Sequence, residues 1–109
     1  MNILRSPELA TDELGPPSLD SKPFLALGDG WALAADSNQW TLCRRRLRQG
    51  VVTWQPVSFV GSSKRMLSVI MIRRGIKVDQ PSNPSVHAFL AAPPVRFLEW
   101  AEQVRSGSV

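Results

Sequence analysis

Three turn signals divide residues 24–60 into four short segments, and this spacing most constrains the fold. Asp29-Gly30 is a two-residue hairpin signal, because a type I′ turn needs positive φ at both central residues. Asp36-Ser37-Asn38-Gln39 forms a four-residue turn, and Gln49-Gly50 forms a third turn. The segments between these turns are predicted to be antiparallel strands joined as a meander. They comprise residues 24–28, 31–35, 40–48 and 51–60.

The turns also fix a register for each pair of strands. They pair Ala26 with Leu33, Leu33 with Leu42, and Leu42 with Val57. Because side chains alternate across a sheet, these pairs collect one uniformly apolar face, which we expect to form the core. Its predicted members are Phe24, Ala26, Leu33, Ala35, Trp40, Leu42, Val57 and Phe59. Pro56 has no N–H to donate, so the fourth strand is predicted to be an edge strand or to carry a bulge there.

Three helices are predicted after the strands. Gly61-Ser62-Ser63 ends the sheet and caps a helix that runs to about Arg74, with Gly75 at the C′ position. On a helical wheel, Lys64, Arg65 and Ser68 lie opposite the apolar arc that packs on the sheet.

Two further helices follow, from Asn83-Pro84 to about Ala91 and from Val95 to about Arg105. The predicted fold class is therefore α+β: a four-stranded antiparallel meander sheet packed by the following helix, then two short C-terminal helices. Residues 1–23 are predicted to be an acidic, flexible tail, and residues 24–109 a single α+β domain.

The charged residues are segregated along the chain. Residues 1–36 carry six acids and two bases, whereas residues 37–78 carry nine bases and no acid. Seven of those nine bases are arginines, which favours bidentate contact with phosphate or carboxylate. The partners expected for such a segment are nucleic acid or an acidic protein surface. The alternative is a solvated basic face that keeps the protein soluble.

Four of these nine bases fall on the predicted hairpin 44–54, which we expect to project beyond the core as a basic ribbon. Arg45 lies opposite Trp54 as a candidate cation–π pair, and Trp54 is the tryptophan expected to be exposed. A twisted ribbon of this kind can enter a major groove, with tryptophan stacking on a sugar or base. The alternative is an exposed hairpin whose tryptophan is covered by arginine stems. The residues predicted to bind nucleic acid or a partner are Arg44, Arg45, Arg46, Arg48, Trp54, Lys64 and Arg65.

The sequence carries no strong catalytic or metal motif. Residues 61–65 could hold a phosphate or carboxylate at a helix start, although ordinary serine capping is the favoured interpretation. His87 is the only histidine and Cys43 the only cysteine, so a metal site or an internal disulfide is not expected. We expect a non-enzymatic protein without a cofactor. With no apolar run long enough to span a membrane, the expected location is the cytoplasm, and no membrane partner is expected.

Two stretches resemble known families. Residues 27–36, Gln39-Trp40, the arginine run, residues 54–60 and Ser63-Lys64 resemble small uncharacterised proteins encoded in bacterial prophages, over about half the chain. That resemblance implies a mobile-element origin. Short proteins of that origin often bind nucleic acid or block a host defence complex, as anti-CRISPR inhibitors do.

Residues 40–75 also resemble the AP2-type arm-binding module of tyrosine integrases, in which three strands precede a helix. By position, Arg44, Arg46 and Trp54 would take the groove-reading roles of that module. An extra leading strand, Pro56 and two further helices depart from its pattern.

The sequence thus predicts a phage or mobile-element-type protein that binds nucleic acid or a nucleoprotein surface through its basic ribbon. The alternative is an inhibitor that docks the same basic face on an acidic surface of a host defence complex. A third interpretation is a structural subunit that oligomerises through an exposed apolar side of the first two strands, formed by Leu25, Leu27, Ala32 and Ala34.

Overall fold

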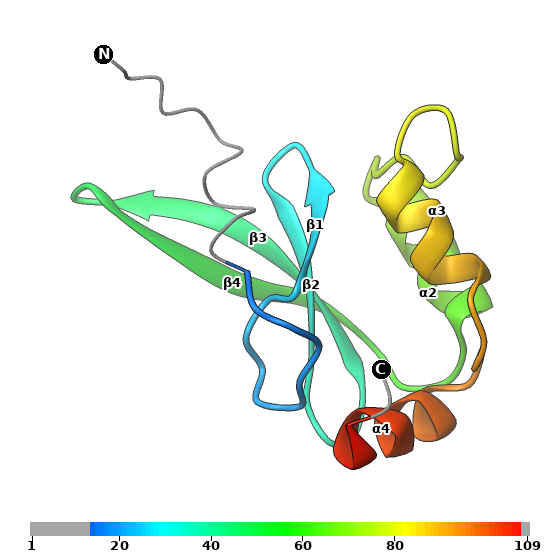
Figure 1. The fold of residues 1–109 in the computed structure, drawn as a ribbon. Coiled ribbons are helices and arrows are strands. Elements are labelled where there is room, and N and C mark those ends of the chain that lie inside the picture. Colours follow the sequence, from blue (N-terminus) through cyan, green and yellow to red (C-terminus); the bar gives the residue numbers. More distant parts are fainter. Residues whose placement is uncertain (1–13, 108–109) are drawn as a thin grey trace.

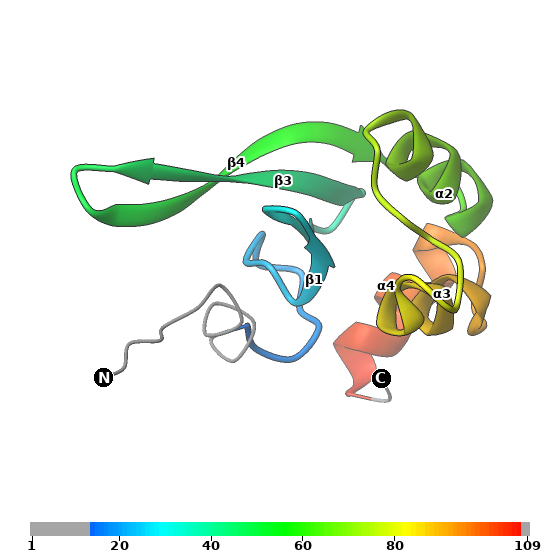
Figure 2. The same cartoon turned by 90° about the horizontal axis from the view of Figure 1, so that it is seen from above.

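Four antiparallel strands form one sheet in the order β1-β2-β3-β4 (Figures 1 and 2). The structure, a computed structural model, describes residues 14–107. The strands are β1 (Leu25–Gly28), β2 (Trp31–Ala35), β3 (Trp40–Arg48) and β4 (Val51–Val60). The helices are α2 (Lys64–Arg73), α3 (Pro84–Ala91) and α4 (Phe97–Ser106). The predicted α+β meander followed by three helices is confirmed.

All three predicted turns are present. Asp29 and Gly30 have φ values of 54° and 83°, and Gln49 and Gly50 have φ values of 51° and 80°, as type I′ turns require. The longer turn is closed by Asp36, whose Oδ1 accepts hydrogen bonds from the N–H groups of Asn38 (2.7 Å) and Gln39 (3.0 Å). Turn chemistry therefore fixes where each strand begins and ends.

A bulge changes the register of the first hairpin. Ala26 pairs with Ala32 while Gly28 pairs with Trp31, so β1 carries one residue more than β2 between these pairs. Gly28 has a φ of 93°, a conformation that glycine adopts without strain. The predicted pairing of Ala26 with Leu33 is therefore wrong: Leu25 takes that place, and Leu27 is buried in the core.

A second bulge changes the register of β4. Leu33 pairs with Leu42 as predicted, but Leu42 pairs with Ser58, and Cys43 pairs with Pro56. Val57 is the extra residue between them, at the bulge that Pro56 led us to expect. Beyond the bulge the side chains exchange faces, so Val60 is buried and Phe59 is 58% exposed. The prediction that Phe59 belongs to the core is wrong for this reason.

An aromatic cluster joins the sheet to the last two helices. The Trp40 ring is fully buried, and its centroid lies 5.0 Å from that of Phe97 and 5.5 Å from that of Trp100. Phe24 stacks on Trp100 at 5.5 Å, and Phe89 of α3 meets the same group of rings. These contacts place α3 and α4 against the β1–β3 part of the sheet.

Helix α2 begins and ends as predicted. The Ser63 side chain accepts a hydrogen bond from the N–H of Met66, and Gly75 has a φ of 81°. Helix α3 begins after Asn83 as predicted, but the Asn83 side chain does not cap it. Its Nδ2 donates to the carbonyls of Leu27 and Lys77, both at 3.0 Å, and so ties the start of α3 to β1.

The side of β1 and β2 that was predicted to be exposed is covered. Leu27, Ala32 and Ala34 are buried and Leu25 is half-buried, so the predicted oligomerisation surface does not exist on these strands. Of the predicted tail, residues 1–13 lie outside the described residues. In the rest of it, Leu19 packs against the core and the Ser21 N–H donates to the Ala35 carbonyl at 2.8 Å.

No helix within residues 14–107 is long and apolar enough to cross a membrane.

The first prediction concerns the junction between β4 and α2. A Cβ atom on Gly61 would lie 2.9 Å from the backbone oxygen of Asn38, which belongs to a turn closed by Asp36. We expect Gly61→Ala to lower the free energy of unfolding by about 1–3 kcal/mol, the typical effect of overpacking. Gly15→Ala is the control, because nothing lies within 4 Å of its Cβ. Urea denaturation with equal midpoints for the two variants would contradict this interpretation.

Candidate functional site

The outer halves of β3 and β4 form a two-stranded ribbon that extends past the rest of the sheet. The last residue of β3 to pair with β2 is Arg44, and the Arg45 N–H donates to the Gly30 carbonyl at 2.7 Å. Beyond this point, residues 45–54 pair only with each other, which leaves the outer edge of each strand free. In both Figure 1 and Figure 2 this hairpin projects away from the three helices. We call it the ribbon.

One face of the ribbon carries Arg44, Arg46 and Arg48, because alternate residues of a strand share a face. Alternate arginines along a strand are about 6.6–6.8 Å apart. The Arg44 guanidinium lies 4.8 Å from the centre of the Trp31 ring, and Arg46 Nε donates to Gln55 Oε1 at 2.8 Å. These contacts orient two of the three side chains, and Arg46 and Arg48 remain exposed.

The opposite face of the ribbon is largely apolar. Arg45 pairs with Trp54 in the predicted register, and Leu47 pairs with Val52. Leu47 is 64% exposed and Val52 is 40% exposed, whereas Trp54 is half-buried. The cation–π contact at this end of the sheet is made by Arg44 on Trp31 and not by the predicted pair.

No carboxylate of the described chain forms an ion pair with an arginine of the ribbon. Within residues 14–107 the one ion pair joins Arg105 to Glu102, at 3.5 Å on helix α4. The arginines of the ribbon therefore keep their charge available to a partner, in a stretch of 42 residues that contains no acid.

Lys64 does not join this surface. It is only 4% exposed, and its Nζ donates to the carbonyls of Phe89 (2.8 Å) and Ala92 (2.7 Å). The ammonium also lies 4.2 Å from the centre of the Phe89 ring. These carbonyls end α3, where the helix dipole is negative. The prediction that Lys64 lies on the solvent side of its helix is wrong, because the ammonium caps a neighbouring helix.

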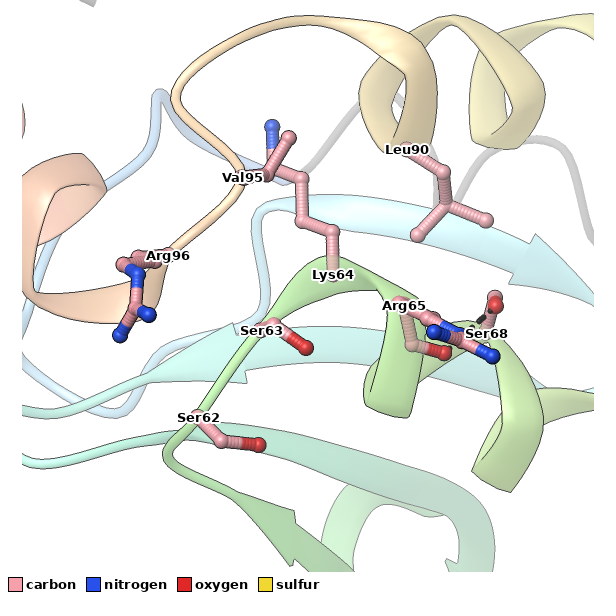
Figure 3. Close-up of a pocket in the computed structure, with 8 residues that line it drawn as sticks. All are labelled: Ser62, Ser63, Lys64, Arg65, Ser68, Leu90, Val95 and Arg96. Carbon is pink, nitrogen blue, oxygen red and sulfur yellow. Dashed lines mark hydrogen bonds between the residues drawn. The ribbon is translucent and has the colours of Figure 1, made fainter.

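Arg65 lies apart from the ribbon, beside an open pocket of about 620 Å³ between α2 and the segment that joins α3 to α4. Figure 3 shows Arg65 and Arg96 at opposite ends of the residues drawn, with the Lys64 side chain turned away from both. The backbone N–H of Lys64 at the helix start donates to the Val95 carbonyl at 2.7 Å, and the Ser63 hydroxyl accepts a hydrogen bond from the Met66 N–H. Serine capping, the favoured interpretation of residues 61–65, is confirmed. The pocket is lined by Ser62, Ser63, Lys64, Arg65, Ser68, Leu90, Val95 and Arg96.

Cys43, the single cysteine of the chain, is buried. Burial raises the pKa of the Cys43 thiol to about 11, which keeps it protonated at neutral pH. Within the described part of the chain, no three His, Cys, Asp or Glu side chains lie close enough to hold a metal ion.

Three residues of the ribbon were not among the predicted site residues. Gln55 orients Arg46, and Leu47 and Val52 supply the exposed apolar face. The signal for all three was present: a two-residue turn at Gln49-Gly50 fixes the whole register of the hairpin and hence the membership of each face.

Comparison with protein-family models, curated proteins and solved structures found no match to this chain. The resemblances described above therefore stay predictions, and the ribbon itself carries the functional argument.

The second prediction concerns Lys64. Burial lowers its pKa to about 8 from an ordinary value of 10.5. Between these values the unfolded chain holds more protons, so the free energy of unfolding should rise with pH. Between pH 7.5 and pH 9.5, the free energy of unfolding of wild type should rise by about 1–2 kcal/mol relative to that of the Lys64→Met variant.

The measurement is urea denaturation of both proteins at the two pH values. Cys43 acts in the opposite direction, because its raised pKa removes stability as the pH rises above 9. That effect is common to both proteins and cancels in the difference. A difference between the two proteins that does not change with pH would show that Lys64 does not titrate in this range.

Proposed function

We propose that this protein is a non-catalytic nucleic-acid-binding protein that contacts phosphates through the ribbon. The observation that supports this proposal is the projecting hairpin itself, in which four arginines stand at five successive positions and, among residues 14–107, none of them forms an ion pair. Arginine binds phosphate through a planar, bidentate fork and stays charged at any physiological pH. A ribbon free at both edges presents these side chains without rearrangement of the core.

The contact residues in this proposal are Arg44, Arg45, Arg46 and Arg48, with Trp54 as a stacking residue. Lys64 is left out, because carbonyl oxygens already surround its ammonium. Arg65 is also left out, since it belongs to helix α2 and lines the pocket there, whereas the ribbon projects away from the helices.

The third prediction tests this proposal with two charge-reversal pairs. Arg46→Glu with Arg48→Glu should weaken binding to fluorescein-labelled DNA at least tenfold at about 50 mM NaCl. It should also reduce the slope of log affinity against log salt by about 2, since each phosphate contact contributes about one unit. Arg73→Glu with Lys77→Glu makes the same change in net charge on exposed residues of the helical side and is the matched control.

The measurement is fluorescence anisotropy, titrated at several salt concentrations. If both pairs weaken binding equally, net charge and not the ribbon drives association. If wild type binds neither duplex nor single-stranded DNA at low salt, the proposal is wrong.

A protein partner is the second candidate, favoured by the exposed apolar side chains at the tip of the ribbon. Leu47, Val51 and Val52 are 64%, 60% and 40% exposed. Apolar side chains ringed by arginines are typical of a protein interface. In this alternative the ribbon docks on an acidic surface of a host defence complex and inhibits it. The charge-reversal pair at Arg46 and Arg48 should then abolish capture of that complex.

A further inference from the structure

We infer that the ribbon binds an unpaired nucleic-acid strand, with its bases on the apolar face and its phosphates along the arginines. This inference rests on the proposed function and names the class of its ligand. It starts from a difference between the two faces of one hairpin. One face carries Arg44, Arg46 and Arg48 beside Gln55, Thr53 and Val51, and the other carries Leu47, Val52 and Trp54 beside Arg45.

A duplex would use only half of this surface. Paired bases are stacked on each other, so a duplex offers phosphates and the polar edges of its bases. With the Arg46 face toward a duplex, the Leu47 face would stay in water. With the Leu47 face toward it, two of the exposed arginines would point away from the phosphates.

An unpaired strand can use both faces. Its bases expose flat apolar surfaces that stack on aromatic side chains, and its backbone needs cations alongside. The outer edge of β3 is free beyond the hydrogen bond between Arg45 and Gly30, and arginines emerge on both sides of that edge. A strand running along this edge would meet Arg44, Arg46 and Arg48 on one side and Arg45, the cross-strand neighbour of Trp54, on the other.

Trp54 is the residue best placed to stack a base. Trp31, Trp40 and Trp100 are 8%, 0% and 2% exposed, which leaves Trp54 as the one half-buried tryptophan of the four. Arg45 is its cross-strand neighbour, and the exposed Leu47–Val52 pair extends the apolar surface toward the tip. A base stacked here would cover side chains that are otherwise exposed to water.

Because only Trp54 is partly exposed, intrinsic tryptophan fluorescence can report the stacking of a base. The other three indoles are buried, so a base can quench tryptophan emission by direct stacking only at Trp54. Unlabelled dT20 should quench part of this emission, whereas a 20-base-pair duplex should leave it nearly unchanged.

The fourth prediction uses two substitutions at this position. Trp54→Leu keeps an apolar side chain but removes the flat ring, and it should weaken binding of dT20 about tenfold or more. Trp54→Phe keeps a ring and should retain most of the affinity. The loss of affinity in Trp54→Leu should be larger for dT20 than for the duplex, because paired bases are already stacked on each other. Thermal unfolding of both variants shows whether the hairpin still folds.

The outcomes separate this inference from the proposed function. Tighter binding of dT20 than of the duplex, with quenching and a selective loss in Trp54→Leu, supports both. Equal affinity for dT20 and duplex, or a folded Trp54→Leu variant that binds dT20 as wild type does, overturns the inference and leaves the proposed function standing. Binding of neither nucleic acid removes both.

Discussion

The packing of aromatic rings around Trp40 is the interaction on which the rest of the structure depends. Trp40 begins β3, and rings from α3 and α4 close around it at centroid distances of 5.0–6.2 Å. Burying a large apolar side chain contributes about 1.5–3 kcal/mol, and edge-to-face ring pairs add to that. Among residues 14–107, the buried Nε1 of Trp40 has no hydrogen-bond partner. Such a donor costs about 1–3 kcal/mol, which the surrounding ring contacts must offset.

Because this core gathers around β1, β2 and the first half of β3, the second half of the hairpin is left without cover. Strand β2 has five residues, whereas β3 and β4 have nine and ten. The covered part of the hairpin ends at Arg44, whose guanidinium lies over the ring of Trp31 at the end of the core. A long hairpin anchored at one end is therefore a direct consequence of unequal strand lengths, and the body of the protein serves as its support.

Local sequence signals were enough to predict the strands and helices. The features that could not be predicted depend on residues that are distant in the sequence. Turn residues and helix caps placed all seven elements, because each depends on a few neighbouring residues. The registers of β1 and β4 were missed because a bulge adds one residue and exchanges the faces that follow, as Phe59 shows. Lys64 was misplaced because its partners lie 25 and 28 residues further along the chain. The ribbon was predicted well, since a two-residue turn fixes its register locally.

The bulge at Val57 has a further effect on the ribbon. Bulges increase the local twist of a hairpin, and this one lies between the packed end of β4 and its free end. Beyond the bulge, Val60 lies on the core face of β4. Before the bulge, the turn at Gln49-Gly50 sets which side chains of the ribbon lie on each face. The two faces of the ribbon are thus defined independently of the core. A flexible basic tail would supply the same charge, but only a paired hairpin holds arginines and an apolar surface on opposite sides. Such an arrangement reduces the conformational entropy lost on binding and makes the chemistry of each face specific.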